Sequence, residues 1–404
     1  MNSRIFFPRA SGDLIRELSQ HFKVVMVTGA RQVGKSTLLK NCDPERKYVT
    51  LDDPLIRSLA NEDPELFIKR YEPPVTIDEV QYAPQLFSYM KMKVDSMEDA
   101  GLYWLTGSQH FSMMKNVSES LAGRVAVINL KTLSYSEIIG RENVRFLPNS
   151  DFLSKRRGEQ KENHDIFDLI WRGSYPQLLQ DERISKDVFY SSYIQTYIDR
   201  DVSQFAKVGS QMDFLKFIKV CAARNASMLN FSEISADAAI PIYQAKKWFS
   251  ILLASDLVYT IEPYFDNRLK RAIKTPKFYF SDTGLCSYLA SWNSARALED
   301  GAMSGEYFEN YVINEIIKSY SNCGVKPPLY YYRDKEKKEI DLIVESDGKL
   351  HPVEIKKTAT PKKDMIKNFN VISPEMMGEG ALVCRHSEDV PLTKDVSVLP
   401  VWYL

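Results

Sequence analysis

The stretch from Lys23 to Leu39 constrains the fold most, because an apolar run is followed at once by a loop bounded by two glycines. The run from Val24 to Val27 is predicted to be a short buried strand, and the residues from Lys35 onward to open a helix. Four residues separate Gly29 from Gly34, and Lys-Ser follows, which is the spacing of a phosphate-binding loop. Glycines let backbone amides turn toward an anion, and the helix start adds its positive dipole end. The sequence therefore predicts a strand, loop and helix that bind a nucleoside triphosphate.

This pattern assigns a task to each loop position. Lys35 is predicted to act on the outer phosphates as a point charge, and the hydroxyl of Ser36 to coordinate Mg²⁺. The residues predicted to bind ATP are Gly29, Ala30, Arg31, Gln32, Val33, Gly34, Lys35, Ser36 and Thr37. The alternative is a chance glycine-rich turn after a core strand, which the order of strand, loop and helix disfavours.

A second apolar run, from Val75 to Ile77, ends in two carboxylates, Asp78 and Glu79. In an open sheet of parallel strands, the ends of the strands gather at one edge, beside the phosphate loop. We therefore expect Asp78 to hold Mg²⁺, directly or through water, and Glu79 to polarise the attacking water. The alternative is that the two acids simply end a strand at the surface.

Two further residues are candidates for catalysis. A predicted strand, 102–106, is followed by Ser108, a polar residue that could reach the γ-phosphate or the attacking water. Arg124 precedes another apolar strand, 125–130, and could stabilise charge on the transferred phosphoryl group as an arginine finger does. A solvated arginine at the start of a strand is the alternative for Arg124.

Together, the segments GARQVGKST, VTIDEVQ, TGSQ and SLAGRVAV resemble the AAA+ superfamily. More narrowly, the chain is similar to predicted archaeal-type bacterial ATPases that end in a domain of unknown function, DUF4143. The turn Gly173-Ser174-Tyr175-Pro176 and the segment YIQTYIDRDV, 193–202, resemble two more motifs of that family, with Ser174 replacing its second glycine. The resemblance covers essentially the whole chain. It implies ATP, Mg²⁺ and hydrolysis.

The expected fold class is α/β, with four parts. Residues 1–140 are expected to form an AAA+ domain around a parallel P-loop sheet. Residues 141–206 are expected to form a linker and a helical lid, and the polar, charged stretch 141–165 reads as a surface loop or insertion. A winged-helix domain is expected at 207–290. A C-terminal α/β domain like the restriction endonucleases is expected at 300–404.

The winged-helix expectation comes from three helical stretches within 213–255, followed by strand-like pieces at 257–262 and 277–280. The third helix of such a unit often enters the major groove of DNA. Residues 243–277 contain three acidic residues and seven basic ones. The basic residues are Lys246, Lys247, Arg268, Lys270, Arg271, Lys274 and Lys277. Such a patch suits DNA backbone contacts, and a protein-docking surface with solvated lysines is an equal alternative.

The last hundred residues carry a second candidate site. A helix at 306–320 is followed by strand-like runs, and Asp341 lies 13 residues before Glu354 in one predicted hairpin. Asp341 and Glu354 could bind one hard cation, and Lys356 could steady a phosphate or activate water. This resembles the PD-(D/E)XK nuclease superfamily, in which Glu309 matches the helical acid. Alternating charge on an exposed strand, or a nuclease fold kept only for binding, are the alternatives.

Composition limits the remaining choices. The 53 basic residues balance 53 acidic ones, so global charge predicts no nucleic-acid or membrane partner, although a local patch still could. Five scattered cysteines predict reduced thiols, and the lack of a signal-like or membrane-length apolar run predicts a soluble, cytoplasmic protein. A protein partner and an oligomer stay open.

The leading hypothesis is an ATPase whose hydrolysis drives rearrangement of the appended domains. A Mg²⁺-dependent DNA nuclease regulated by ATP is one alternative, and a nucleotide-switched docking protein is the other.

Overall fold

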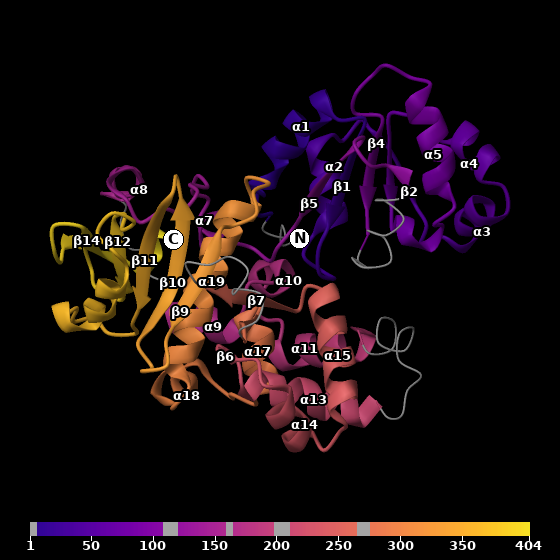
Figure 1. Cartoon of the computed structure of the whole chain (residues 1–404). Helices are drawn as coiled ribbons and strands as arrows, with labels where there is room; N and C mark the ends of the chain where they lie inside the picture. Colours follow the sequence, from indigo (N-terminus) through magenta and orange to yellow (C-terminus); the bar gives the residue numbers. More distant parts are fainter. Residues whose placement is uncertain (1–5, 108–119, 159–164, 198–210, 265–274) are drawn as a thin grey trace.

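The computed structural model describes residues 6–107, 120–158, 165–197, 211–264 and 275–404 of the 404-residue chain. Two sheets organise it, one with five strands and one with nine. Figure 1 shows the first sheet, in indigo and purple, apart from the strands β9 to β14 of the second, in orange and yellow. No described helix is long and apolar enough to cross a membrane.

The first sheet is entirely parallel, in the order β2-β3-β4-β1-β5. Its strands are β1 Val24–Thr28, β2 Lys47–Thr50, β3 Val75–Asp78, β4 Tyr103–Thr106 and β5 Val125–Asn129. Strands covered on both faces read as continuous apolar runs, which is why β1, β3 and β4 could be found from the sequence. The expected α/β fold class with a P-loop sheet is confirmed.

Helices cover both faces of this sheet. Successive strand side chains point to opposite faces, so Val25 and Val27 pack in one core and Val24 and Met26 in another. The first core contains residues of α1 and α2, and the second contains residues of α3, α4 and α5. Their bounds are α1 Ser11–His21, α2 Lys35–Cys42, α3 Pro54–Glu62, α4 Pro64–Arg70 and α5 Leu86–Asp95.

The described part of the polar stretch 141–165 is not a surface loop, which corrects the prediction. It follows α7 Tyr135–Ile138 and contains α8 Ser150–Arg156, with Phe146, Phe152 and Leu153 buried. The Phe146 backbone N–H donates to Ser319 Oγ at 3.1 Å, and Tyr320 Oη donates to the Phe146 carbonyl at 2.7 Å. The buried apolar side chains, spaced among charged ones, fix the segment against the C-terminal part of the chain.

Helices dominate the middle of the chain. The predicted helical pattern from 166 is present as α9 Ile166–Arg172, α10 Pro176–Gln180 and α11 Lys186–Tyr197. A second group follows as α13 Gln211–Ala223, α14 Phe231–Ala238 and α15 Ile242–Ala254. Three strands accompany the second group: β6 Ser227–Met228, β7 Val258–Pro263 and β8 Lys277–Phe280.

The second sheet has the order β13-β14-β12-β11-β10-β9-β7-β8-β6, so it crosses the boundary expected between 290 and 300. Strand β7 pairs in parallel with β9, with Glu262 opposite Tyr330. The C-terminal strands are β9 Leu329–Arg333, β10 Glu339–Ser346, β11 Lys349–Ile355, β12 Gly380–Cys384, β13 Val390–Pro391 and β14 Val396–Pro400. The two predicted units therefore share one sheet.

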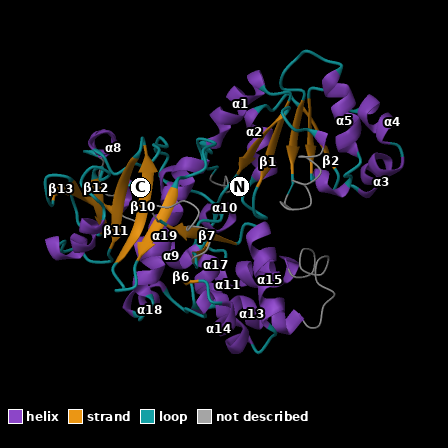
Figure 2. Ribbon diagram, viewed as in Figure 1, coloured by secondary structure: helices purple, strands orange, loops and turns teal. Residues whose placement is uncertain are grey.

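Helices α17 Thr283–Leu289, α18 Ala295–Asp300 and α19 Ser304–Ser321 connect and cover this sheet. Residues Lys363–Val371 form a 3-10 helix. In Figure 2, α10 lies between the parallel sheet and the C-terminal strands. This position places α10 beside the phosphate loop.

Candidate nucleotide site

The loop after β1 has the backbone shape that its glycines predict. Gly29 has φ 137° and Gly34 has φ 97°, in the region that favours glycine, and Gln32 also has a positive φ, 60°. A Cβ at Gly29 would clash with the carbonyl oxygen of Leu130, so only glycine fits there. Gly34 is the N-cap of α2, and the helix therefore begins at Lys35 with its free amides facing the loop.

Lys35 is buried beneath this loop. Its Nζ donates to the Gly29 carbonyl at 3.1 Å and to the Ala30 carbonyl at 2.8 Å. Burial lowers the pKa of Lys35 to about 8, and the charge of Glu79 opposes this shift. A buried ammonium beside carbonyl dipoles would gain much from an incoming anion, because a negative charge favours its protonated form.

The structure brings Ser36 and Asp78 together. Ser36 Oγ donates to Asp78 Oδ1 at 2.7 Å, so the hydroxyl at the start of α2 meets the carboxylate at the end of β3. Tyr48 Oη donates to Asp78 Oδ2 at 2.6 Å, and the Thr106 hydroxyl donates to Oδ1. Hard oxygen donors of this kind are the ligands that Mg²⁺ prefers. Three hydroxyls thus orient one carboxylate.

Glu79 follows with a left-handed backbone, φ 57°, which is uncommon for a residue other than glycine. Its N–H donates to Thr106 Oγ1 at 3.1 Å, and the Gln81 amide donates to its carboxylate. Thr106 therefore contacts both acids that end β3. The roles of Thr106 and Tyr48 were not predicted, although Thr106, a polar residue within the buried strand β4, is a usable signal. Ser108, predicted to be catalytic, lies outside the described residues.

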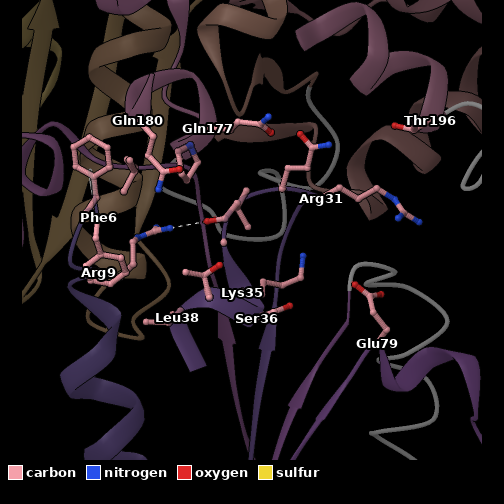
Figure 3. A pocket seen from close by; sticks show the side chains of 17 residues that line it. Phe6, Arg9, Arg31, Lys35, Ser36, Leu38, Glu79, Gln177, Gln180 and Thr196 are labelled. Carbon is pink, nitrogen blue, oxygen red and sulfur yellow. Dashed lines mark hydrogen bonds between the residues drawn. The ribbon is translucent and has the colours of Figure 1, made fainter. Parts of the chain in front are cut away.

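A cavity of about 510 Å³ lies over the loop (Figure 3). Lys35, Ser36 and Glu79 line it from the parallel sheet. The rest of its lining includes the N-terminal segment and α10 and α11, with Phe6, Phe7, Arg9, Pro176, Gln177, Gln180 and Thr196. The site therefore lies between the P-loop sheet and the middle of the chain. None of the N-terminal or α10 residues was predicted.

Arg9 fixes the loop from its outer side. Its guanidinium forms a buried ion pair with Glu137, Nε to Oε1 at 2.9 Å. It also donates to the carbonyls of Val33 at 2.8 Å and Lys131 at 2.7 Å. These bonds join the phosphate loop to the segment that follows β5. Arg9 is thus a positioning residue.

Arg124 lies at the opposite end of the sheet. Val24 is opposite Val125 in the parallel pair of β1 and β5, so Arg124 precedes the strand whose far end faces the loop. Five residues of strand span roughly 16 Å, which is beyond the reach of an arginine side chain. Arg124 instead pairs with Asp95, Nη2 to Oδ2 at 3.1 Å. This placement corrects the arginine-finger prediction for the phosphate site of its own chain.

The four residues predicted as a nuclease-like site converge where α19 packs on the second sheet. Lys356 Nζ lies 3.2 Å from Asp341 Oδ2 and 2.6 Å from Glu354 Oε1. Glu309 Oε1 accepts from Tyr279 Oη at 2.7 Å and pairs with Lys277 Nζ at 3.1 Å. The sequence predicted that Lys277 belongs to an exposed basic patch for DNA or for protein docking. That assignment is wrong, because Lys277 is buried and also pairs with Glu339 at 2.5 Å.

Burial dominates the electrostatics of this cluster. It raises the pKa of Glu309 to about 7, and the ammonium of Lys277 opposes the shift. Burial and the charge of Asp341 raise the pKa of Glu354 to about 8, and Lys356 opposes that shift. Within the described residues, no group of three or more His, Cys, Asp or Glu side chains is placed to hold a metal ion. Two lysines supply the positive charge instead.

Three domain families match successive parts of the chain. Residues 21–139 match an AAA domain, residues 163–296 a domain of unknown function, DUF8612, and residues 304–404 a domain of unknown function, DUF4143. Two curated proteins, uncharacterized protein Mb2031c of Mycobacterium bovis and uncharacterized protein Rv2008c of Mycobacterium tuberculosis, are each 26% identical to the chain over 351 residues. Each alignment covers 86% of this chain and 73% of the relative.

Two of the solved structures with partial similarity are a Walker-type ATPase and a nucleotide-bound protein. The Walker-type ATPase Paby2304 of Pyrococcus abyssi is 15% identical, with a TM-score of 0.46, over 70% of this chain and 96% of that one. AMPPCP-bound DnaA from Aquifex aeolicus is 14% identical, with a TM-score of 0.30, over 60% of this chain and 85% of that one.

Proposed function

This chain carries an AAA domain followed by a DUF4143 domain, and from that premise we propose that it hydrolyses ATP with Mg²⁺ at the site on β1 and β3. The single observation that carries the proposal is the contact between Ser36 and Asp78, 2.7 Å apart, next to the buried Lys35. A chance glycine turn would have no reason to meet a carboxylate from another strand at the mouth of a cavity. The match of residues 21–139 to an AAA domain supports an AAA-type ATPase.

The residues around the cavity fit a Mg²⁺-bound triphosphate. Ser36 Oγ and Asp78 are the oxygen donors that would hold the ion, and Tyr48 and Thr106 would keep the Asp78 carboxylate oriented. Bound Mg²⁺ supplies neutralisation of the charge that develops on the phosphate oxygens. The loop amides after Gly29 and the ammonium of Lys35 would bind the phosphates.

Glu79 is the residue proposed as general base. Its carboxylate lines the cavity, and its left-handed backbone and the Thr106 contact set its direction. A carboxylate there would accept a proton from a water molecule as that water attacks. The Gln81 amide would hold the carboxylate in place until then.

Substitutions at the two ends of this arrangement test the proposal. Lys35→Ala should abolish ATP binding, because Lys35 contacts the phosphates of the bound ground state. Glu79→Gln should keep binding and lose turnover by at least about a hundredfold, since a general base acts in the transition state. Arg124→Ala is the matched control and should change the rate less than about threefold, as a surface pair does. Hydrolysis by Glu79→Gln at the wild-type rate would remove Glu79 from this role.

We further propose that hydrolysis rearranges the appended parts through α10. The Ser174 carbonyl accepts from the Leu133 N–H at 2.9 Å, which ties the turn before α10 to the segment after β5. The Ser174 N–H donates to Asp282 Oδ2 at 2.8 Å, and Asp282 also caps α17. A shift of α10 against the nucleotide would thus pull directly on α17.

A second candidate function is DNA binding with cleavage. Helices α13, α14 and α15 with β6, β7 and β8 follow the chain order of a winged helix, and Lys246 and Lys247 are exposed on α15. Arg268, Lys270, Arg271 and Lys274 lie outside the described residues. A nuclease-like site is favoured because four side chains converge, those of Glu309, Asp341, Glu354 and Lys356. The ammonium groups of Lys277 and Lys356 pair with these carboxylates, where a nuclease would hold a metal cation. Cleavage would require Lys277 to leave Glu309.

Two assays of the full chain test the two parts of this candidate. If DNA binds at α15, affinity for a labelled duplex should fall steeply with salt, and Lys246→Ala with Lys247→Ala should reduce that slope by roughly two. Nicking of a plasmid with Mn²⁺ should then disappear in Glu354→Gln. Absence of duplex binding at low salt would assign the unit to protein docking instead.

A further inference from the structure

The cavity over the phosphate loop extends well beyond the part that phosphates would fill. Lys35, Ser36 and Glu79 mark its phosphate end. The lining also includes five apolar side chains from four different segments: Phe6, Phe7, Leu38, Leu133 and Pro176. Two aromatic rings and a proline suit the faces of a flat aromatic base, which gains by stacking. In Figure 3, Phe6 and Gln180 lie together on one side of the cavity and Glu79 lies on the other.

Polar side chains near the two aromatic rings include Arg9, Gln177 and Gln180, and of these three only Gln180 is suited to recognition. The guanidinium of Arg9 is already committed to Glu137 and to two backbone carbonyls. Gln177 and Gln180 lie three residues apart on α10, so both face the cavity. Gln177 is exposed to solvent, whereas Gln180 is half-buried and its amide has no hydrogen-bond partner among the described residues.

An amide next to an apolar slot has a specific chemical use. A glutamine side chain offers one acceptor and one donor side by side, and adenine presents the complementary pair along its amino edge. Polar groups placed at the end of an apolar pocket typically set which ligand binds. Gln180 is also well positioned, because the turn before α10 is fixed by Ser174 to both Leu133 and Asp282.

We propose that Gln180 recognises the 6-amino edge of adenine and makes this site selective for an adenine nucleotide. The Gln180 carbonyl oxygen accepts from the 6-amino group, and its NH₂ group donates to a neighbouring ring nitrogen. This inference rests on the proposed function, because the phosphates must lie at Lys35 for the base to reach α10. Gln180 lies on α10, outside the phosphate-loop motif.

The test uses the full chain and two nucleotides, ATP and purine riboside triphosphate, which lacks the 6-amino group. Wild type should bind ATP about five- to tenfold more tightly than the analogue, the value of one neutral hydrogen bond. Gln180→Ala should bind the two nucleotides with equal affinity, within about twofold. Gln177→Ala is the matched control on the same helix and should keep the wild-type ratio. Melting temperatures of all three proteins check folding.

Each outcome is decisive. A Gln180→Ala protein that keeps the wild-type ratio overturns the inference and leaves the ATPase proposal standing. Equal binding of both nucleotides by wild type also overturns the inference alone. Binding of neither nucleotide by folded wild type would overturn the ATPase proposal itself, and the two failures are therefore distinguishable.

Discussion

At the scale of single residues, Lys35 makes nucleotide binding sensitive to pH. Burial holds its pKa at about 8 in the free protein, and phosphates beside the ammonium would raise that pKa. Above pH 8 Lys35 has largely lost its proton in the free protein, so nucleotide binding must take up a proton. Affinity should therefore fall as pH rises above 8, by at most about tenfold per pH unit.

Calorimetry in two buffers of different ionisation enthalpy measures this uptake. At pH 8, wild type should take up roughly half a proton more than Lys35→Arg, because arginine stays charged throughout. The arginine variant also accounts for protons exchanged by the nucleotide itself. Equal uptake by both proteins would mean that Lys35 is already fully charged in the free protein.

The same residues show what a sequence can reveal about a site. Lys35, Ser36, Asp78 and Glu79 were found because each belongs to a short contiguous pattern with a known spacing. The contact of Arg9 with Glu137 joins residues 128 positions apart and carries no local signal. Contacts of that kind depend on how whole elements pack, and the sequence of a single segment does not predict that packing.

At the scale of elements, the turn before α10 depends on the absence of a side chain at Gly173. This residue has φ 85°, and a Cβ there would clash with Tyr190 Oη, with Asp282 Oδ1 and with the backbone of Gly284. Gly173→Ala should lower the free energy of unfolding by about 3 kcal/mol or more, since strain and overpacking add. Chemical denaturation measures the loss.

Gly140 provides the matched control for Gly173. It also has a positive φ, 69°, but nothing lies within 4 Å of where a Cβ would be. Gly140→Ala should therefore lower the free energy of unfolding by only about 1 kcal/mol, the cost of a positive φ for alanine. Equal losses at the two positions would show that the contacts with Tyr190 and Asp282 do not hold the turn.

Elements were predicted best where periodicity was strong and worst where composition was used instead. Helices and strands within 213–280 follow their apolar spacing, which reports directly on burial. The charged composition of 141–165 predicted a surface loop, yet the side chains of Phe146, Phe152 and Leu153 are buried and anchor its described part. A few buried apolar side chains can therefore fix a segment whose average composition is polar.

At the scale of the whole molecule, the chain is less modular than its domain matches suggest. The parallel pairing of β7 with β9 makes one sheet of strands from residues 227–280 and 329–400. Lys277, from β8, then enters the acidic cluster of the C-terminal part. A boundary drawn from sequence near residue 300 separates an ammonium from its two carboxylates, and no pattern within either part could have shown this.

The full chain should therefore lose stability in a pH-dependent way when Lys277 is replaced. Lys277→Met leaves the buried carboxylate of Glu309 without its cation, whereas Glu339 keeps its pair with Arg333. Removal of one partner from a buried pair costs about 3–5 kcal/mol. Burial already raises the pKa of Glu309 to about 7, and loss of the ammonium would raise it further. An acid whose folded-state pKa is raised holds its proton in the folded state, so stability falls as pH rises from about 4.5 through 7.

The loss should accordingly be larger at pH 8 than at pH 6, as seen in melting temperatures at the two pH values. Lys338→Met, which removes an exposed lysine paired with Glu336, is the control and should change stability by less than about 0.5 kcal/mol. Adding Glu309→Gln to Lys277→Met should recover most of the loss at pH 8, because glutamine reproduces the neutral acid. Equal losses at both pH values would mean that Lys277 acts by packing alone. A pH-dependent loss that Glu309→Gln repairs would show that charge on one strand of the middle unit holds the C-terminal cluster together.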